Sequence, residues 1–261
     1  MTKKERLDTL LVARNLAQDQ SHAQRLVMAG QVRVNGQVAL KPATQVPLEA
    51  NLSVDLGPRF VSRGGEKLEA ALQAFAIHPQ GLVCADVGAS TGGFSDCLLQ
   101  YGAARVYAID VGSGILDWKL RQDERVVVME ATNARQVAQL PETADLVVID
   151  ASFISLKVLL PVVRSWLKPE VGEVVALIKP QFEASRAQVS RGKGVIRDQT
   201  IHHQVLVEIL QAAQASGFTA RGLIRSPLLG PKGNAEFLAW FTLGKDEGKA
   251  NVDLIEALFS E

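Results

Sequence analysis

The chain has 261 residues, of which 47% are hydrophobic and 21% are charged, and its formal net charge is zero. These values are typical of a globular protein and exclude an intrinsically disordered chain. The apolar stretches are strand-sized or interrupted by charge, and the start is polar, so we expect no membrane span, no secretion signal and a cytoplasmic location. The two cysteines and four histidines lack metal-ligand spacing, so we expect no metal site.

The first 63 residues are basic, with nine Lys and Arg side chains against five Asp and Glu side chains. Leu7, Leu10 and Leu11 predict a short helix, and Ser21-His-Ala-Gln24 predicts a capping box that opens a second helix. Alternating apolar residues on both sides of Asn35-Gly36 predict a β-hairpin. We therefore expect a small α+β domain over residues 1–56 and a linker over residues 57–63.

This first segment resembles the S-four-like RNA-binding module of several ribosomal RNA modifying enzymes. The resemblance covers about residues 4–56 and depends on Arg6-Leu-Asp8, His22-Ala-Gln-Arg-Leu26 and Gly30-Gln-Val-Arg-Val-Asn-Gly36. It implies that basic side chains bind RNA phosphates. The candidates are Arg6, Arg14, Arg25 and Arg33. Asp19-Gln20 departs from the family, which often has a basic residue there, and a small domain with solvated basic side chains is the alternative.

Residues 64–261 have the pattern of a doubly wound, mostly parallel α/β domain of Rossmann-like type. An amphipathic helix follows Gly64-Gly65, with Leu68, Ala71 and Leu72 on its inner face. Further helices are expected after Asp150 and from about Gln199, and residues 235–243 predict a late strand. Runs without alternation predict strands buried on both faces of a parallel sheet, at residues 82–85, 105–110, 126–129, 145–150 and 174–179.

A glycine-rich turn joins the first of these strands to the next helix. It reads Asp86-Val-Gly-Ala-Ser-Thr-Gly-Gly-Phe94, and Ser90 stands where a dinucleotide-binding turn has its second glycine. Tight wrapping of a pyrophosphate is therefore disfavoured, and S-adenosylmethionine, which has no phosphate, fits better. Asp110 ends the next strand, where an acidic residue can accept hydrogen bonds from a ribose. The alternative is that Asp86 and Asp110 only cap turns.

Two charged residues end neighbouring predicted strands, Asp150 and Lys179. Ligands of such sheets bind beyond the carboxyl ends of the strands, and ionisable groups buried there are costly unless they are paired or functional. A structural ion pair is the alternative. With Lys67 and Glu236 added, the order Lys67, Asp150, Lys179, Glu236 resembles the tetrad of the FtsJ-related ribose 2′-O-methyltransferases.

The whole chain resembles the haemolysin-A-like (TlyA) family of ribosomal RNA 2′-O-methyltransferases. Besides the first segment, the resemblance depends on Val61-Ser-Arg-Gly-Gly-Glu-Lys-Leu68, the glycine turn, Asp150-Ala-Ser-Phe-Ile-Ser-Leu156, Lys179-Pro-Gln-Phe-Glu183 and Gly230-Pro-Lys-Gly-Asn234. It implies that S-adenosylmethionine is the methyl donor and that a cytidine ribose hydroxyl of ribosomal RNA, met on a ribosomal subunit, is the acceptor.

These arguments assign roles to three sets of residues. Lys179 is the candidate base for the ribose hydroxyl, with Asp150 to orient it and with Lys67 and Glu236 to position the ribose. Arg63 and the basic segment 186–197, which we expect to be a flexible loop, complete the RNA-binding set through Arg191 and Lys193. The cofactor-binding candidates are Asp86, Gly88, Ser90, Thr91, Gly92, Gly93, Phe94, Asp110, Asn133 and Asp150.

Three other functions remain as alternatives. A non-catalytic RNA-binding ribosome factor would keep the basic first segment without an intact glycine turn or tetrad. A pore-forming haemolysin, suggested by the family's historical name, would need an apolar or amphipathic membrane segment. A nicotinamide oxidoreductase is disfavoured by Ser90 in the glycine turn.

Overall fold

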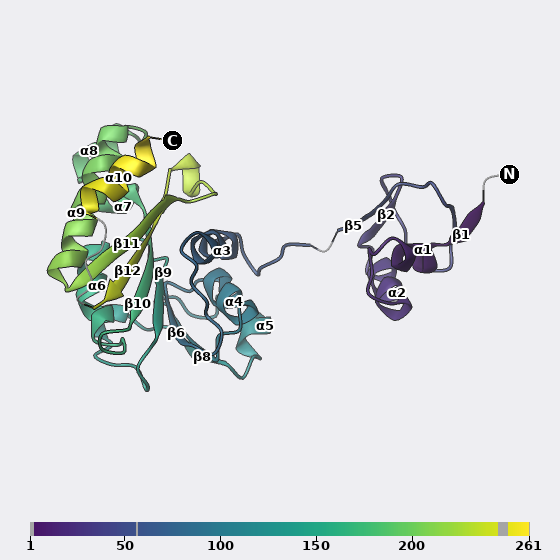
Figure 1. Cartoon of the computed structure of the whole chain (residues 1–261), viewed down its shortest axis with the longest axis horizontal. Helices are drawn as coiled ribbons and strands as arrows, with labels where there is room; N and C mark the ends of the chain where they lie inside the picture. Colours follow the sequence, from purple (N-terminus) through teal and green to yellow (C-terminus); the bar gives the residue numbers. More distant parts are fainter. Residues whose placement is uncertain (1–2, 56, 245–249, 261) are drawn as a thin grey trace. The chain divides into compact units, whose positions relative to one another are not determined.

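The computed structural model describes residues 3–55, 57–244 and 250–260, and the chain divides into two compact units, residues 1–59 and 60–261 (Figure 1). Residue 56, where we placed the end of the first domain, lies outside the described residues. The second unit begins inside the segment predicted as a linker. Phe60 is 2% exposed there and packs against Gly65, where a Cβ atom would lie 2.2 Å from the ring.

The first unit is a small α+β fold around one apolar cluster that includes Leu7, Leu11 and Val27. The predicted hairpin is present, since β2 pairs with β3 around Asn35 and Gly36, which both have positive φ. The predicted capping box is wrong, because α2 begins at Gln20 and Asp19 accepts the hydrogen bond from the His22 N–H. The elements are β1 (Lys4–Arg6), α1 (Leu7–Ala13), α2 (Gln20–Met28), β2 (Val32–Val34), β3 (Gln37–Val38), β4 (Gln45–Pro47) and β5 (Leu52–Val54).

The second unit is built on a seven-stranded sheet in the order β11-β12-β10-β9-β6-β7-β8. The five strands from β10 to β8 are parallel, whereas β12 runs antiparallel to both of its neighbours. This confirms the predicted mostly parallel sheet. The strands are β6 (Val83–Val87), β7 (Arg105–Ile109), β8 (Val126–Met129), β9 (Leu146–Ile149), β10 (Glu173–Ile178), β11 (Phe218–Arg225) and β12 (Phe237–Leu243).

Helices cover both faces of this sheet (Figure 1). Alternate residues of β9 point to opposite faces, so Val147 and Ile149 pack in the cluster with α6 and α9, and Leu146 and Val148 pack in the cluster with α3 and α4. Both clusters are apolar, which explains the strands' lack of alternation. The helices are α3 (Gly64–Ala74), α4 (Gly93–Gln100), α5 (Trp118–Arg121), α6 (Leu156–Arg164), α7 (Pro180–Glu183), α8 (Arg186–Arg191), α9 (Gln199–Ala215) and α10 (Asn251–Phe259), with 3₁₀ turns η1 (Ala134–Gln136) and η2 (Pro231–Gly233).

The expectation of a flexible loop over residues 186–197 is wrong in its first half. Residues 186–191 form the short helix α8, which begins with a capping box between Ser185 and Gln188. The four basic residues of the segment, Arg186, Arg191, Lys193 and Arg197, are exposed, but the capping residues decide that the backbone of residues 186–191 is helical.

The direction of the strands explains how distant residues reach one edge of the sheet. The parallel strands β6, β7, β9 and β10 all end at this edge, whereas the antiparallel strand β12 begins there, with Phe237 opposite Ile178. Residues that follow β9 and β10 therefore meet the residue that precedes β12. Asp150, Lys179 and Glu236 occupy these three positions.

Candidate active site

Gly88 lies at the closest approach between the turn after β6 and the turn after β9. Its φ is +85°, and a Cβ atom at this position would lie 2.7 Å from the Asp150 carbonyl oxygen. The Asp150 N–H in turn donates to the Val87 carbonyl at 2.9 Å, which holds the two turns together. Glycine is therefore required at position 88 both for the backbone conformation and for the contact.

Asp86 supports the turn from beneath and lines neither of the cavities described below. It is fully buried, and its Oδ2 accepts hydrogen bonds from the Ser95 N–H (2.9 Å) and the Ser95 hydroxyl (2.7 Å) near the start of α4. Burial raises the pKa of Asp86 to about 7, against the lowering effect of the Ser95 hydrogen bonds. Our assignment of Asp86 to cofactor binding therefore needs correction, because its side chain acts on α4.

Two adjoining cavities open at this edge of the sheet. The first, here called the Asp110 cavity, has a volume of about 260 Å³ and is lined mainly by apolar side chains with Asp110, Thr132 and Asn133. The second, the Lys67 cavity, has a volume of about 510 Å³ and is lined by Arg63, Lys67, Lys179 and Lys232 among others. The residues common to both walls are Gly88, Ser90, Asp150 and Ser152. A ligand in one cavity would thus lie next to a ligand in the other.

Of the remaining turn residues, Thr91, Gly93 and Phe94 line the Lys67 cavity. Gly92 lines neither cavity, because it faces α5, where an added Cβ atom would lie 2.1 Å from the Leu120 side chain. The turn therefore contributes to both cavities, and the wall that it gives to the Asp110 cavity consists of Val87, Gly88 and Ser90.

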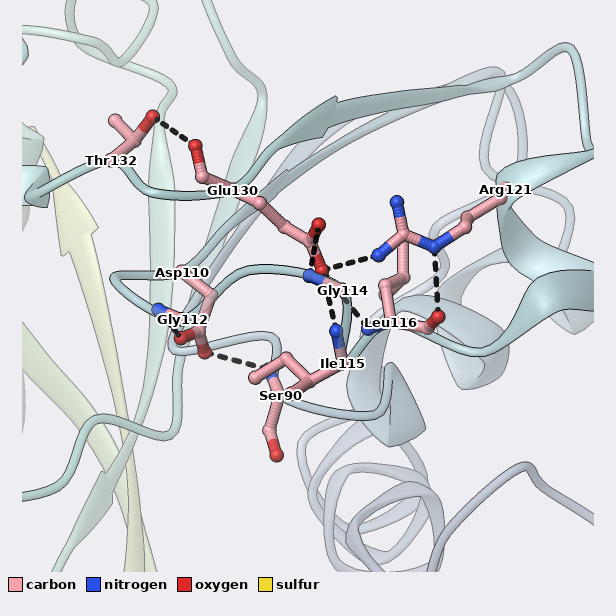
Figure 2. Close-up of polar contacts among 9 residues, drawn as sticks. All are labelled: Ser90, Asp110, Gly112, Gly114, Ile115, Leu116, Arg121, Glu130 and Thr132. Carbon is pink, nitrogen blue, oxygen red and sulfur yellow. Dashed lines mark hydrogen bonds and ion pairs between the residues drawn. The ribbon is translucent and has the colours of Figure 1, made fainter.

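The wall of the Asp110 cavity is fixed by two carboxylates that follow adjacent strands (Figure 2). Asp110 accepts hydrogen bonds from the Ser90 N–H (2.8 Å) and the Gly112 N–H (2.7 Å). Each carboxylate oxygen can accept two hydrogen bonds, so both oxygens of Asp110 keep acceptor capacity toward a ligand.

Glu130, which follows β8, accepts from the backbone N–H groups of Gly114, Ile115 and Leu116 at 2.8–3.0 Å and pairs with Arg121 at 2.5 Å (Figure 2). The Arg121 guanidinium and these N–H groups lower the pKa of Glu130 to about 2. Because Ile115 lines the Asp110 cavity, this network sets the shape of its outer wall.

Lys179 and Asp150 form a close ion pair between the two cavities. Lys179 Nζ lies 2.5 Å from Asp150 Oδ1 and donates to the Ser152 hydroxyl at 3.1 Å. The lysine side chain is 9% exposed and that of Asp150 is 22% exposed, so the amine is reached only through the cavities. The Phe182 ring centroid lies 5.8 Å from Nζ and gives the amine an apolar neighbour.

Lys67 and Glu236 form a second ion pair, with Lys67 Nζ 2.6 Å from Glu236 Oε2. Lys67 lines the cavity, whereas Glu236 is buried behind it and does not line it. The other oxygen, Oε1, is buried without a hydrogen-bond partner in the described part of the chain. The structure thus brings all four predicted residues together, with Lys67, Asp150 and Lys179 at the cavity surface and Glu236 holding Lys67.

The predicted RNA-binding residues have different surroundings. Arg14 donates to the carbonyl oxygens of Leu48 and Ala50, so its guanidinium stabilises the first unit from within. Arg6 forms two hydrogen bonds with the buried Asp8, at 2.7 and 3.0 Å. Arg25 donates to the Ser21 hydroxyl at 2.9 Å, and Arg33 is an exposed residue of β2. In the second unit, Arg63 lines the Lys67 cavity, and Arg191 and Lys193 are exposed at the end of α8.

Sequence reasoning did not identify three residues that shape the site. Ser152 contacts Lys179, Glu130 fixes the wall of the Asp110 cavity, and Lys232 lines the Lys67 cavity. For Glu130, its position directly after β8 was an available signal, since acidic residues at strand ends had already been used for Asp110 and Asp150. Ser152 lies in a loop and Lys232 in the 3₁₀ turn η2, where spacing alone predicts no partner.

The chain matches two family models. Residues 60–243 match the FtsJ-like methyltransferase family, and residues 5–52 match the S4 domain. The methyltransferase match covers almost all of the second unit, which contains the seven-stranded sheet, the glycine turn and the two cavities. The chain is therefore a member of the FtsJ-like methyltransferases.

Full-length relatives define the family more narrowly. The 16S/23S rRNA (cytidine-2′-O)-methyltransferase TlyA of Mycobacterium tuberculosis is 43% identical over 264 residues, which cover 99% of this chain and 97% of the relative. Hemolysin A of Brachyspira hyodysenteriae is 40% identical over 91% of this chain and 100% of its own. The chain belongs to the haemolysin-A-like (TlyA) family of ribosomal RNA methyltransferases.

Solved structures agree with the fold. One described as a hemolysin from Streptococcus thermophilus is 40% identical, covers 100% of this chain and 98% of its own, and has a TM-score of 0.72. An S-adenosylmethionine-dependent methyltransferase from Listeria monocytogenes, at 18% identity and a TM-score of 0.53, covers 70% of this chain and 100% of its own and supports the fold alone. Over the described residues, no helix has both the length and the apolarity that crossing a membrane requires.

Proposed function

We propose that this protein transfers a methyl group from S-adenosylmethionine to the ribose 2′-hydroxyl of a cytidine in ribosomal RNA. The observation that carries the proposal is that the Asp110 and Lys67 cavities share Asp150 in their walls, and that Lys179, which lines the Lys67 cavity, pairs with it. A donor in the first cavity and an acceptor hydroxyl in the second would then meet beside a buried amine. The cytidine preference is taken from the named M. tuberculosis relative.

The Asp110 cavity suits an adenosine-containing cofactor. Its walls are apolar apart from a few polar groups at fixed positions, which is the usual composition of a cofactor site. Asp110, with acceptor capacity on both carboxylate oxygens, would bind the ribose hydroxyls, and Asn133 and Ser90 would supply further polar contacts. Bound S-adenosylmethionine supplies a methyl group that is activated by its positively charged sulfur.

The residues between the cavities supply the acid–base chemistry. A ribose hydroxyl is a weak acid, so Lys179 in its neutral form accepts the proton as the oxygen forms its new bond to carbon. Asp150 and Ser152 fix the direction of the amine, since each contacts Nζ. Lys67 lies on the same cavity wall and stabilises negative charge that develops on the acceptor oxygen, with Glu236 holding it in place.

Basic groups on both units would hold the RNA. Arg63 and Lys232 at the wall of the Lys67 cavity, and Arg191 and Lys193 at the end of α8, lie on the second unit and can bind phosphates near the target. The S4 domain supplies a separate RNA-binding surface, for which Arg6, Arg25 and Arg33 are the exposed candidates. Ribosomal subunits in the cytoplasm are the expected partners, and a base in a helix would leave its stack to reach the cavity.

The test is transfer of a tritiated methyl group from S-adenosylmethionine to purified ribosomal subunits and to naked ribosomal RNA. Lys179→Ala should lower the rate by at least about 100-fold, the usual contribution of a general base, with binding of S-adenosylhomocysteine retained. The matched control is Lys168→Ala, because Lys168 forms a 2.6 Å ion pair with Asp145 at the opposite end of β9. Wild-type protein that labels no ribosomal RNA would refute the proposed function, and an active Lys179→Ala variant would refute the assigned base.

A further inference from the structure

We propose that Glu183 is a positioning residue for the Asp150–Lys179 pair, and that it acts by fastening together the two loops that carry these residues. This inference rests on the proposed function, because it concerns the same reaction. Glu183 ends the short helix α7, which begins directly after Lys179. It contacts neither Asp150 nor Lys179 in any hydrogen bond or ion pair of the described structure, so its effect would be indirect.

The carboxylate of Glu183 accepts hydrogen bonds from the end of the loop that follows Asp150. Its Oε2 accepts from the Ser155 hydroxyl at 2.5 Å, and its Oε1 accepts from the Leu156 N–H at 2.8 Å. Ser155 is the N-cap of α6, and the Leu156 N–H is one of the first N–H groups of that helix, which have no partner within it. Glu183, which lies in α7 after β10, thus caps α6, the helix that follows β9.

The loop fastened in this way is the one that orients the amine. Residues 151–155 connect Asp150 at the end of β9 to Leu156 at the start of α6, and they include Ser152, whose hydroxyl accepts from Lys179 Nζ. The rings of Phe153 and Phe182, one from each loop, lie 4.9 Å apart and add an apolar contact at the same junction. The Glu183 contacts therefore help to keep Ser152 beside Lys179, and they add to the β9–β10 pairing and the Val87 hydrogen bond that hold Asp150.

Glu183 is half-buried, and this partial burial supports a function for its contacts. Burial raises the pKa of its carboxyl group, and the hydrogen bonds from Ser155 and Leu156 oppose that effect. The nearby cation, Lys157, pairs with Glu208 at 2.5 Å, so the contacts that compensate Glu183 are its hydrogen bonds with Ser155 and Leu156. Partial withdrawal of a carboxylate from water is costly unless its contacts compensate, and here the compensating contacts are the ones that join the loops.

The experiment compares Glu183→Ala, Glu183→Gln and Asp145→Ala in single-turnover methyl transfer to ribosomal RNA. Asp145 is the matched control because it also joins two elements, through Val83 N–H (2.9 Å) and Lys168 (2.6 Å), but at the opposite edge of the sheet. Glu183→Ala should lower the rate constant about 10- to 100-fold, as displacement of reacting groups by about 1 Å does. Glu183→Gln should recover most of the rate, because its amide can still accept from Leu156 and bond to Ser155.

Two further readouts separate positioning from general destabilisation. The affinity for S-adenosylhomocysteine, measured by calorimetry, should fall much less than the rate constant in Glu183→Ala, because Asp110, Thr132 and Asn133 keep their positions although the loop 151–155 also lines the Asp110 cavity. The amine of Lys179, whose side chain is 9% exposed in the intact protein, should react severalfold faster with acetic anhydride once the loops separate. If Glu183→Ala does not fold, Ser155→Ala removes one of the two contacts and gives the same comparison.

Several outcomes would overturn the inference. One is an active wild type with an equally active Glu183→Ala variant. Another is a loss of rate in Asp145→Ala as large as that in Glu183→Ala, since the effect would then follow stability. Failure of Glu183→Gln to recover activity would also count against it. An inactive wild type would instead refute the proposed function.

Discussion

Replacement of Gly88 by alanine tests the close approach between the turns after β6 and β9. The new Cβ atom would lie 2.7 Å from the Asp150 carbonyl oxygen and 3.0 Å from Ala151 Cα, and both neighbours are backbone atoms. The Asp150 N–H bond to Val87 prevents an easy shift. A non-glycine residue in the left-handed region costs about 1–2 kcal/mol, and overpacking adds about 1–3 kcal/mol, so the loss of unfolding free energy should be about 2–5 kcal/mol.

Gly81 supplies a control in the same unit. Its φ of +76° is similar to the +85° of Gly88, but an added Cβ atom at position 81 has no neighbour within 4 Å. Gly81→Ala should therefore lose only the backbone contribution of about 1–2 kcal/mol. Urea unfolding of both variants, followed by tryptophan fluorescence, isolates the steric contribution as their difference.

The same substitution should also affect ligand binding. If the turn moves to relieve the contact, Gly88 and Asp150 separate, and both cavities lose a shared wall. Calorimetry should then show weaker binding of S-adenosylhomocysteine by Gly88→Ala and unchanged binding by Gly81→Ala. The reasoning fails if Gly88→Ala is no less stable than Gly81→Ala and binds the ligand as wild type does.

Two other predictions follow from the carboxylates of this edge. Glu130→Gln should weaken binding of S-adenosylhomocysteine, measured by calorimetry. The neutral amide holds Arg121 and the N–H groups of Gly114 and Ile115 less strongly than the carboxylate does. An unchanged affinity would exclude a role for this network in binding. Asp86 has a folded-state pKa of about 7, above its ordinary value of 3.8, so its contribution to stability is complete below pH 3.8 and is lost as the pH rises through 7. Asp86→Asn should therefore have a higher melting temperature than wild type at pH 8.5, and this difference should be smaller or absent at pH 5. Equal differences in melting temperature at the two pH values would contradict the raised pKa of Asp86.

Much of the fold could be predicted because its signals are local. Apolar runs such as residues 145–150 and 174–179 predict strands buried on both faces, and Asn35-Gly36 predicts the hairpin, whose positive φ angles the structure shows. The errors also arose from local competition. Asp19, two residues before the predicted Ser21 box, is the stronger cap in its context, and Ser185 starts a helix where charge had suggested a loop.

The candidate site could be predicted in part for the same reason. Asp110, Asp150 and Lys179 each end a strand, so a rule about strand ends places them at one edge. The roles of Glu130 and Glu183 depend on which N–H groups nearby turns present to them, and no periodicity encodes that geometry. Asp86 shows the converse error, since its place in the motif suggested a ligand contact although its side chain points under α4.

The reversed strand β12 explains why the four tetrad residues have such different positions in the sequence. Asp150 and Lys179 follow parallel strands, but Glu236 precedes its strand, and only an antiparallel β12 brings it to the same edge. Lys67 comes from α3, and its 2.6 Å pair with Glu236 joins this helix to the strand. With β12 parallel instead, Glu236 would lie at the opposite edge, so the direction of one strand decides whether Lys67 has a partner beside the cavity.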